Sequence, residues 1–412
     1  MNRTVRTALL LFAVTLAVRL AVGVWTGLGR EPVEDERGYV RLAQSVAEDH
    51  ELRMERLYQA HGEVIRWSFR GPVVPLVFAP FARPWDPFRL TEKSTGVDKM
   101  RLVAILLGAL GPPLLFLAAR RGPLGDRAWW TGLAYALWPP AIYVSVRALS
   151  EAPSQALFLG GMALLCLPRT KGGVLGGALA ALAVLARPAA LFPAGLLVFA
   201  TGSRRRAIGF LVAFMAVLAP WEIRNYRLHG RVLLTTNTGV TLVGGNSQAA
   251  ADADPPGKWV PPENVYAGAA DAPPSEMDLW GWWDLSEEAS DRRFTADALR
   301  WVGEHPGAAV RLCLWKIVRL FDPDPHSGKD DAGSKAIVGW LTLTPVLLLA
   351  IFGLGAWRTE WPCTLLVVGT VATAFLFYGD TRMRTCADPA LLVFAVHGAT
   401  RVARRVRGAG LD

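Results

Sequence analysis

Residues 5–26 read VRTALLLFAVTLAVRLAVGVWT, an apolar run long enough for one helix to cross a bilayer. Arg19 interrupts the apolar region towards its far end. A cleaved signal peptide would look similar, but no clear small-x-small cleavage motif follows, and many more apolar blocks come later in the chain. The run therefore predicts a first membrane span that is retained in the protein.

The rest of the chain repeats this pattern. Of its 412 residues, 52% are hydrophobic and 19% are charged, whereas about 25% charged residues are usual in a soluble domain. The predicted spans are 5–26, 100–119, 127–146, 153–168, 173–186, 188–202, 207–220, 335–356, 361–379 and 387–402. We therefore expect an all-α polytopic membrane protein with about ten transmembrane helices and a mixed extracytoplasmic segment.

The lysines and arginines indicate how the spans are oriented. With a cytoplasmic N-terminus, alternation of the spans places most cationic clusters on one side, as the positive-inside rule requires. These clusters are Arg3 and Arg6, Arg120 and Arg121, Arg127, Arg169 and Lys171, 204–206, Arg358 and 401–407. A single span over 173–201 would put 204–206 outside, so this pattern favours two spans there. The net charge of +9 thus indicates membrane orientation and not nucleic-acid binding.

Two long segments fall on the outer side in this topology. We expect an N-terminal transmembrane module at 1–220, with its first outer loop at 29–99. A large extracytoplasmic segment follows at 221–334, and C-terminal transmembrane helices occupy 335–412.

The large outer segment contains two predicted helices. Residues 286–303 are expected to form a helix with Ser286 as its N-cap. In 307–321, apolar residues such as Val310 and Leu314 share one helical face, and Lys316 and Arg319 lie opposite. This pattern suits a helix at the membrane interface and, equally well, a core helix of a small outer domain.

Several charged residues depart from the positive-inside pattern. Short connections on the predicted outer side contain Arg147, Arg187, Arg382 and Arg384, with Glu151 nearby. Charges at span ends are costly unless they are solvated or paired, so they tend to mark cavities or ligand sites. The alternative is that each charge is solvated or pairs locally, as Arg147 could with Glu151. As a set, the outer arginines favour binding of the phosphate of a lipid-linked substrate.

An acidic cluster, Glu34-Asp35-Glu36, follows the first span on the same side. A carboxylate beside a cavity at the membrane surface could act as general base on an acceptor hydroxyl or amine. It could also hold a divalent cation that neutralises a phosphate leaving group. The alternative is an ordinary solvated loop, which the spacing alone favours.

An ordered set of short motifs adds a resemblance to these observations. The motifs are Asp35-Glu36-Arg37-Gly38-Tyr39, Arg70-Gly71-Pro72-Val73-Val74-Pro75-Leu76, Ser150-Glu151, Arg187-Pro188, Pro220-Trp221-Glu222-Ile223-Arg224-Asn225-Tyr226 and Arg382-Met383-Arg384. Together they resemble the GT-C membrane glycosyltransferases. More narrowly, they are similar to the family 39-like group, which includes protein O-mannosyltransferases and the aminoarabinose transferase of lipid A. Cys386-Ala387-Asp388 departs from the more apolar stretch usual there.

The resemblance implies a GT-C-like fold and an enzyme that moves a sugar from a polyprenyl-phosphate donor to a lipid, glycan or protein acceptor. It implies Asp35 and Glu36 as catalytic residues. The implied substrate-binding residues are Arg70, Glu151, Arg187, Arg224, Asn225, Arg382 and Arg384. The expected location is the cytoplasmic membrane of a bacterium, as a multi-pass protein surrounded by membrane lipids, with its active face outside.

The identity of any cofactor stays open at this point. The four cysteines show neither a metal-ligand spacing nor a disulfide framework, and no closed metal-ligand set is visible. A divalent cation is an open alternative, and no other cofactor is expected.

Two other functions fit parts of the pattern. A transporter or flippase would show internal inverted repeats and broken spans in both halves, and no such repeat is visible. A ligase or polymerase that uses a lipid-linked oligosaccharide needs the same outer cations and base, so the sequence separates it poorly from the first reading.

Overall fold

The computed structural model describes residues 2–33, 35–58, 62–82, 96–167, 171–267, 286–324 and 332–409. Glu34 of the acidic cluster therefore lies outside the described residues. The first part of the chain forms α1 (Arg3–Thr26), α2 (Asp35–Asp49), α3 (Val73–Phe78), α5 (Val97–Ala119), α6 (Trp129–Ala136), α7 (Pro139–Ser145), α8 (Glu151–Leu165), α9 (Lys171–Ala186), α10 (Leu191–Leu196) and α11 (Arg204–His229).

The second part of the chain is helical as well. It forms α12 (Thr238–Gly245), α13 (Gln248–Asp252), α14 (Pro262–Val265), α16 (Glu287–Glu304), α17 (Pro306–Leu320), α18 (Ala332–Gly353), α19 (Trp361–Leu376), α20 (Thr381–Arg384) and α21 (Asp388–Ala409). Short 3-10 turns are η1 (Ala79–Phe81), η2 (Gly125–Ala128), η3 (Pro188–Ala190), η4 (Leu197–Ala200) and η6 (Leu354–Ala356). β1 (Met54–Tyr58) and β2 (Gly62–Arg66) form an antiparallel hairpin.

Within these described ranges, four helices are long and apolar enough to cross a membrane: Arg3–Thr26, Val97–Ala119, Arg204–His229 and Ala336–Ala356. Shorter apolar helices are present at Lys171–Ala186, Pro188–Ala200 and Trp361–Leu376. Residues 173–201 are divided at Arg187, which has an extended backbone before η3. The structure thus confirms a helical, multi-pass membrane protein, and the count of ten spans stays a prediction.

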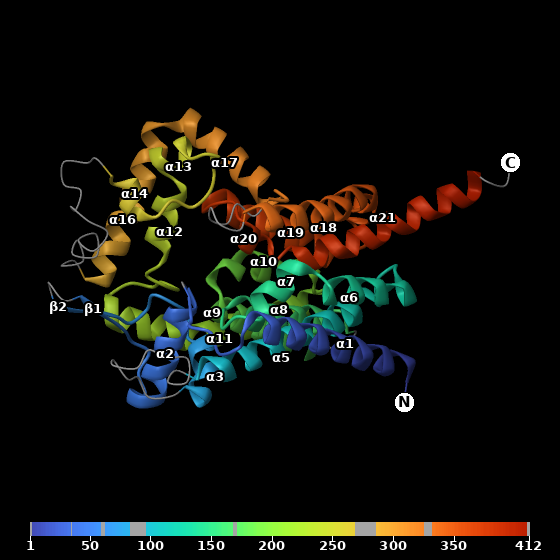
Figure 1. The fold of residues 1–412 in the computed structure, drawn as a ribbon, viewed down its shortest axis with the longest axis horizontal. Helices are drawn as coiled ribbons and strands as arrows, with labels where there is room; N and C mark the ends of the chain where they lie inside the picture. Colours follow the sequence, from blue (N-terminus) through green and yellow to red (C-terminus); the bar gives the residue numbers. More distant parts are fainter. Residues whose placement is uncertain are drawn as a thin grey trace.

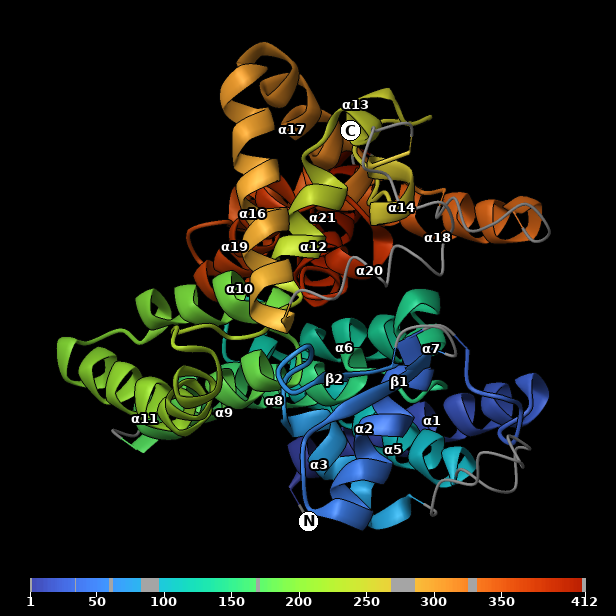
Figure 2. The ribbon, with the colours of Figure 1, turned by 90° about the vertical axis from the view of Figure 1, so that its left-hand side faces the viewer.

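The apolar helices pack in two groups (Figure 2). In one, α1 packs on α5, α8 lies between α5 and α9, and α9 packs on α11; in the other, α18 packs on α21. Contacts of α10 with α19 and of α6 with α21 join the groups. A core of apolar side chains from both groups is continuous across this junction.

The first helix shows why these elements suit a bilayer. Its buried residues, Leu11, Thr15, Arg19 and Gly23, recur every four positions and face the protein. Its other apolar side chains are exposed, as Leu10 shows with 64% of its surface accessible. A helix that is apolar outside as well as inside is typical of a membrane span.

Arg19 has a structural role inside this first group. Its Nε donates to Ser145 Oγ at 2.8 Å, and its Nη1 donates to the carbonyl oxygen of Ala136 at 3.3 Å. Ala136 is the last residue of α6, where the chain breaks before Pro139 because proline cannot continue the helical hydrogen bonds. The guanidinium group therefore supplies a donor to the broken helix.

One end of the molecule holds α2, the hairpin and α12 to α17, and both termini lie at the opposite end (Figure 1). We call the first of these the loop end. The chain is packed closely there: a Cβ at Gly71 would lie 2.0 Å from the carbonyl oxygen of Leu185, so α9 and the end of the first loop meet backbone to backbone. Glycine is required at that point.

The two helices expected in the large segment are present. α16 has Ser286 as its N-cap, with the hydroxyl oxygen accepting from the N–H of Ala289 at 3.2 Å, so this prediction is confirmed. In α17, Val310 and Leu314 are exposed by 63% and 60%, whereas Lys316 is completely buried. Lys316 donates to Asn246 Oδ1 at 2.7 Å, so the side of α17 that carries Lys316 faces inward, whereas Val310 and Leu314 face outward.

Candidate functional site

A connected group of charged side chains lies at the loop end. Arg382 of α20 donates from Nη1 to Asp35 Oδ2 at 2.7 Å and from Nε to Glu151 Oε1 at 2.8 Å. Arg70 Nη2 donates to the other oxygen of Asp35 at 2.6 Å. Arg187 Nη1 is 3.0 Å from Glu151 Oε1. We call these five residues the Asp35 network.

The helices explain how these residues come together. Asp35 and Glu151 occupy the first turns of α2 and α8, and Arg187 follows the end of α9. Helix ends at one side of a bundle meet at the same level, so side chains far apart in sequence become neighbours. Arg187 donates to Ser150 Oγ at 3.1 Å and to the carbonyl oxygen of Arg382 at 3.3 Å.

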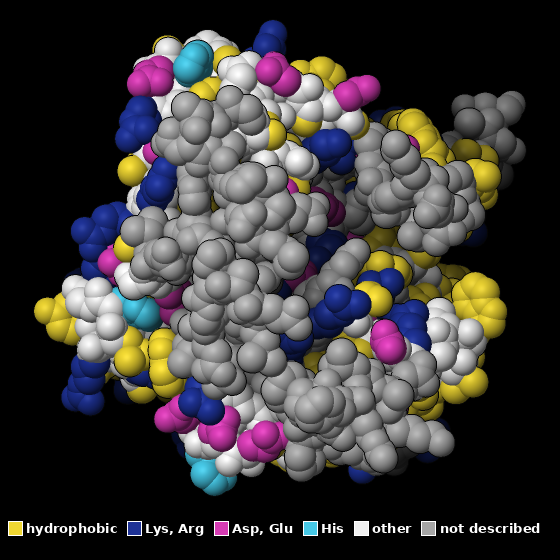
Figure 3. Space-filling model, turned by 60° about the vertical axis from the view of Figure 1, so that its left-hand side comes forward, with side chains coloured by type: hydrophobic (Ala, Val, Ile, Leu, Met, Phe, Trp, Pro, Cys, Tyr) yellow, Lys and Arg dark blue, Asp and Glu magenta, His cyan; other side chains and the backbone are white. Residues whose placement is uncertain are grey.

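The members of the Asp35 network differ in how far solvent reaches them. The side chains of Asp35 and Arg382 are 35% and 33% exposed, whereas that of Glu151 is fully buried. An external ligand can therefore reach Asp35 and Arg382, whereas Glu151 contacts Arg382 on its buried side. Figure 3 shows cationic and acidic side chains together in a hollow of this face.

Charge determines the protonation state of Asp35. The nearby guanidinium of Arg70, and then that of Arg382, outweigh burial and hold the pKa of Asp35 well below its usual range. The network contains three guanidinium groups against two carboxylates, so its net charge is +1. Two buried N–H donors, Nε of Arg70 and Nε of Arg187, have no hydrogen-bond partner among the residues that the structure describes. The arrangement is suited to receiving an anion.

Glu36 lies in a different environment from its neighbour. It forms a fully buried ion pair with Arg101 of α5, at 2.8 Å, and accepts from the N–H of Ala148, also at 2.8 Å. Burial raises the pKa of Glu36, but these hydrogen bonds hold it below its usual range. The structure therefore places Glu36 in the attachment of α2 to α5 and outside the Asp35 network.

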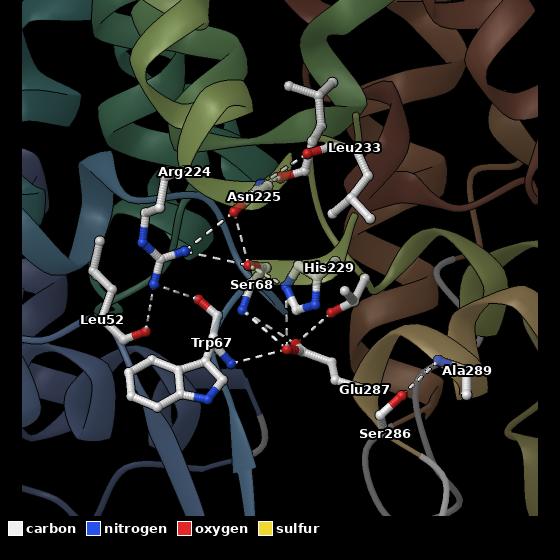
Figure 4. A network of polar contacts seen from close by, with 12 residues as sticks. Leu52, Trp67, Ser68, Arg224, Asn225, His229, Leu233, Ser286, Glu287 and Ala289 are labelled. Carbon is white, nitrogen blue, oxygen red and sulfur yellow. Dashed lines mark hydrogen bonds and ion pairs between the residues drawn. The ribbon is translucent and has the colours of Figure 1, made fainter. Parts of the chain in front are cut away.

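Arg224 and Asn225 belong to a second network, which surrounds Ser68 (Figure 4). Ser68 Oγ donates to Asn225 Oδ1 at 2.8 Å, and Arg224 Nη2 donates to the carbonyl oxygen of Trp67 at 3.2 Å. Asn225 Nδ2 donates to the carbonyl oxygen of Leu233 at 2.8 Å. Both residues thus bind backbone and hold the end of the first loop against α11.

Glu287 completes this second network. Its carboxylate accepts from the N–H groups of Trp67 and Ser68, at 2.9 and 3.1 Å, and from the hydroxyl of Thr236. His229 Nε2 lies 2.9 Å from Ser68 Oγ. Ser68 itself is fully buried. Through these contacts Ser68, His229 and Glu287 join the first loop to α11 and α16.

Arg384 is also outside the Asp35 network. Its Nε donates to Asp388 Oδ1 at 2.8 Å, and Trp138 Nε1 donates to the other oxygen of Asp388 at 2.7 Å. Its Nη1 donates to the carbonyl oxygen of Leu320 at 3.2 Å. Arg384 therefore attaches the start of α21 to α17 and to the break between α6 and α7. The unusual Asp388 is its partner.

Five of the nine predicted site residues thus meet in one network, and the other four hold the fold around it. Sequence reasoning did not identify Arg101, Ser68, His229 or Glu287. Arg101 carried one signal, because it is a charge within the first turns of a predicted span. The other three are ordinary polar residues in polar segments, and nothing in the sequence marks them.

The described residues give little support for a resident divalent cation. They contain no group of three or more His, Cys, Asp or Glu side chains that could hold a metal ion. Asp35 and Glu151, the acidic pair of the network, both bind Arg382. A cation at this place would compete with that guanidinium group for both carboxylates.

Comparison with solved structures places the fold. The oligosaccharyltransferase AglB of Archaeoglobus fulgidus, in complex with an inhibitory peptide and a dolichol-phosphate, superimposes with a TM-score of 0.54 and 11% identity, over 98% of this chain and 52% of that chain. Its apo form gives a TM-score of 0.56 and 10% identity, over 99% and 52%. The chain thus spans about half the length of that enzyme.

A further match is ArnT of Cupriavidus metallidurans bound to undecaprenyl phosphate, with a TM-score of 0.42 and 14% identity, over 95% of this chain and 78% of that chain. No protein-family model matches the chain, and no curated protein matches it by sequence. The likeness to the oligosaccharyltransferase shows that the chain has the same kind of fold, the helical membrane fold that the sequence predicted.

The buried Glu36–Arg101 pair generates a prediction about stability. Arg101→Met should lower the free energy of unfolding by about 3 to 5 kcal/mol, because it leaves the carboxylate of Glu36 buried and without its cation. Thermal unfolding in detergent would measure the loss. The double variant Glu36→Gln/Arg101→Met is the control and should recover part of it, since no charge is then left unpaired. Equal melting temperatures for Arg101→Met and the wild type would contradict the assignment.

Proposed function

We propose that this protein is a membrane glycosyltransferase, which moves a sugar from a polyprenyl-phosphate donor to a lipid, glycan or protein acceptor. The observation that carries the proposal is the Asp35 network, a cationic group built around one accessible carboxylate at the end of a membrane fold. The fold is shared with an oligosaccharyltransferase that was captured with a dolichol-phosphate. A polyprenyl phosphate is the corresponding class of ligand for this chain.

The proposal includes an orientation in the cytoplasmic membrane of a bacterium, with the loop end outside. Several cationic clusters support it: α11 begins with Arg204, Arg205 and Arg206, and exposed arginines occupy the last turns of α21, towards the termini. Lys and Arg are enriched on the cytoplasmic side of membrane proteins. In this orientation the Asp35 network faces away from the cytoplasm.

The donor phosphate would bind to the arginines of the network. The free Nε–H groups of Arg70 and Arg187 and the accessible side chain of Arg382 provide donors for its oxygens. Hydrogen bonds from guanidinium to phosphate are charge-assisted and therefore among the stronger ones in proteins. Their fixed positions would also stabilise the charge that develops on the phosphate as it leaves.

Asp35 is proposed as the general base. An acceptor hydroxyl attacks the anomeric carbon, the bond from that carbon to the phosphate oxygen breaks, and its electron pair leaves with the phosphate. The acceptor proton goes to Asp35. Paired with two arginines, Asp35 is a weak base, because its pKa is held low. When the donor phosphate takes over hydrogen bonds from Arg70 and Arg382, the carboxylate loses stabilisation and becomes more basic.

Asp35→Asn tests the role of Asp35. The variant should lower kcat at least about 100-fold, because general-base catalysis contributes about 100- to 10,000-fold. Its KM for the donor should stay the same or fall, since the arginines keep their charge and lose a competing anion. Transfer of sugar in membrane vesicles measures both constants. Asp49→Asn, at the exposed end of the same helix, is the control and should behave like the wild type. Near-normal turnover by Asp35→Asn would remove Asp35 from this role.

The low pKa of Asp35 generates a prediction about pH. In the wild type, Asp35 is ionised at every pH above its lowered pKa, so it adds no acid limb to kcat/KM between about pH 5 and 8. Arg70→Met removes the largest cause of the lowering, and burial, which raises the pKa of Asp35, is then opposed by Arg382 alone. The pKa should therefore rise, and activity should fall as the pH decreases. Arg70→Lys keeps a charge and should retain the flat profile. Identical acid limbs in the two variants would contradict this account.

A second candidate function is transfer of a whole oligosaccharide, which the match to an oligosaccharyltransferase favours. The two reactions consume different lipids. Under our proposal, a deletion strain should accumulate a polyprenyl monophosphate that carries one sugar, and lipid mass spectrometry would detect it. Accumulation of a lipid-linked oligosaccharide would favour the second candidate, and no change in either lipid would contradict both.

A further inference from the structure

Arg30 and Arg147 lie at the loop end and belong to neither network. Arg147 was a candidate partner of Glu151 by sequence, but Glu151 binds Arg187 and Arg382 instead. Arg147 lies over the ring of Tyr143, with its guanidinium carbon 4.4 Å from the ring centroid. Arg30 follows the end of α1, and its Nη1 donates only a long hydrogen bond of 3.4 Å, to the carbonyl oxygen of Thr26.

The Glu36–Arg101 pair brings these two arginines to the same place. Arg101 Nη1 donates to the carbonyl oxygen of Arg30 at 2.7 Å. On the other side of the pair, Glu36 accepts from the N–H of Ala148, the residue after Arg147. The backbone at Arg30 and at Ala148 thus contacts the same buried ion pair. That pair is itself neutral, and Arg30 and Arg147 add two positive charges next to it.

Several donors of Arg30 and Arg147 are left over by the described part of the chain. Within it, the Nε and Nη2 atoms of Arg30 and the Nε atom of Arg147 are buried without a hydrogen-bond partner. Neither residue forms an ion pair among the described residues. Burial, and then the positive charges of Arg101 and Arg147, lower the pKa of Arg30, against the carboxylate of Glu36, which raises it. Unpaired donors and excess positive charge together select an anion.

The neighbouring surface indicates where this anion comes from. Val24 and Trp25, at the end of α1, are 69% and 84% exposed, and Tyr143 is 43% exposed. Exposed aromatic and aliphatic side chains at the end of a membrane span lie at the level of the lipid headgroups. The unpaired donors of Arg30 and Arg147 are therefore expected at the depth of lipid phosphates.

We propose that Arg30 and Arg147 form a second phosphate site, which binds the phosphate of an anionic phospholipid headgroup. The site shares no residue with the Asp35 network, because the Glu36–Arg101 pair positions Arg30 and Arg147. The proposal does not depend on sugar transfer, because it concerns how the protein binds the surrounding lipid. Free inorganic phosphate has the same chemistry and is the alternative source of the ligand.

The test is a binding titration with Arg30→Gln/Arg147→Gln. The purified, delipidated full chain in detergent is titrated with phosphatidylglycerol, with phosphatidylcholine and with inorganic phosphate, and native mass spectrometry counts the bound molecules. The wild type should bind phosphatidylglycerol at least about tenfold more tightly than the double variant, because two charge-assisted donors are lost. It should also prefer phosphatidylglycerol to phosphatidylcholine, whose choline cation is repelled.

Two further variants keep the result interpretable. Arg37→Gln removes one exposed charge from the same loop and should bind phosphatidylglycerol like the wild type, and Arg30→Lys/Arg147→Lys should restore part of the affinity. Melting temperatures establish that each variant is folded. Displacement of the lipid by inorganic phosphate at similar concentration would support the site with free phosphate as its ligand. Equal lipid binding by the wild type and the glutamine double variant would overturn the proposal, as would equal losses in the double variant and Arg37→Gln.

Discussion

The guanidinium group of Arg382 lies between two carboxylates that come from distant parts of the chain, Asp35 in α2 and Glu151 in α8. Glu151 is fully buried at the start of α8, and a buried charge without a partner strongly destabilises a protein. Arg187 and Arg382 both pair with Glu151, so this carboxylate holds α20 and the residue after α9 against the start of α8. Arg382 and Arg70 then hold Asp35, and the Glu36–Arg101 pair attaches α2 to α5. These ion pairs together determine where the accessible carboxylate lies.

The general architecture could be predicted from composition, because span length and the distribution of cations follow directly from the properties of a bilayer. The partners of the charged residues could not. Asp35 and Glu36 are adjacent in sequence, but successive residues of a helix point about 100° apart, so they face different neighbours. One reaches Arg70 and Arg382, and the other reaches Arg101. The sequence indicates that carboxylates are present, and only the packing of α2 decides which one is accessible.

The motif at 220–226 shows that sequence prominence does not reveal the role of a residue. Arg224 and Asn225 stand out in the sequence, but in the structure they bind backbone carbonyl groups and Ser68. Carbonyl groups at the end of a loop need donors wherever the loop is buried, and arginine and asparagine supply several each. A prominent motif can therefore mark a demanding position of the backbone as readily as a contact with a substrate. The division between the two networks could not be predicted without coordinates.

The charge of the Asp35 network connects its architecture to the proposed reaction. If its acids and arginines were equal in number, a phosphate would have to displace a carboxylate completely in order to bind. With three arginines and two carboxylates, one positive charge and two unpaired N–H donors remain after every internal ion pair has formed. An anion can therefore bind first through these free donors and afterwards exchange with Asp35 on Arg382. In that order the carboxylate is released only when donor phosphate is present, so the base becomes active in the complex in which its proton transfer is useful.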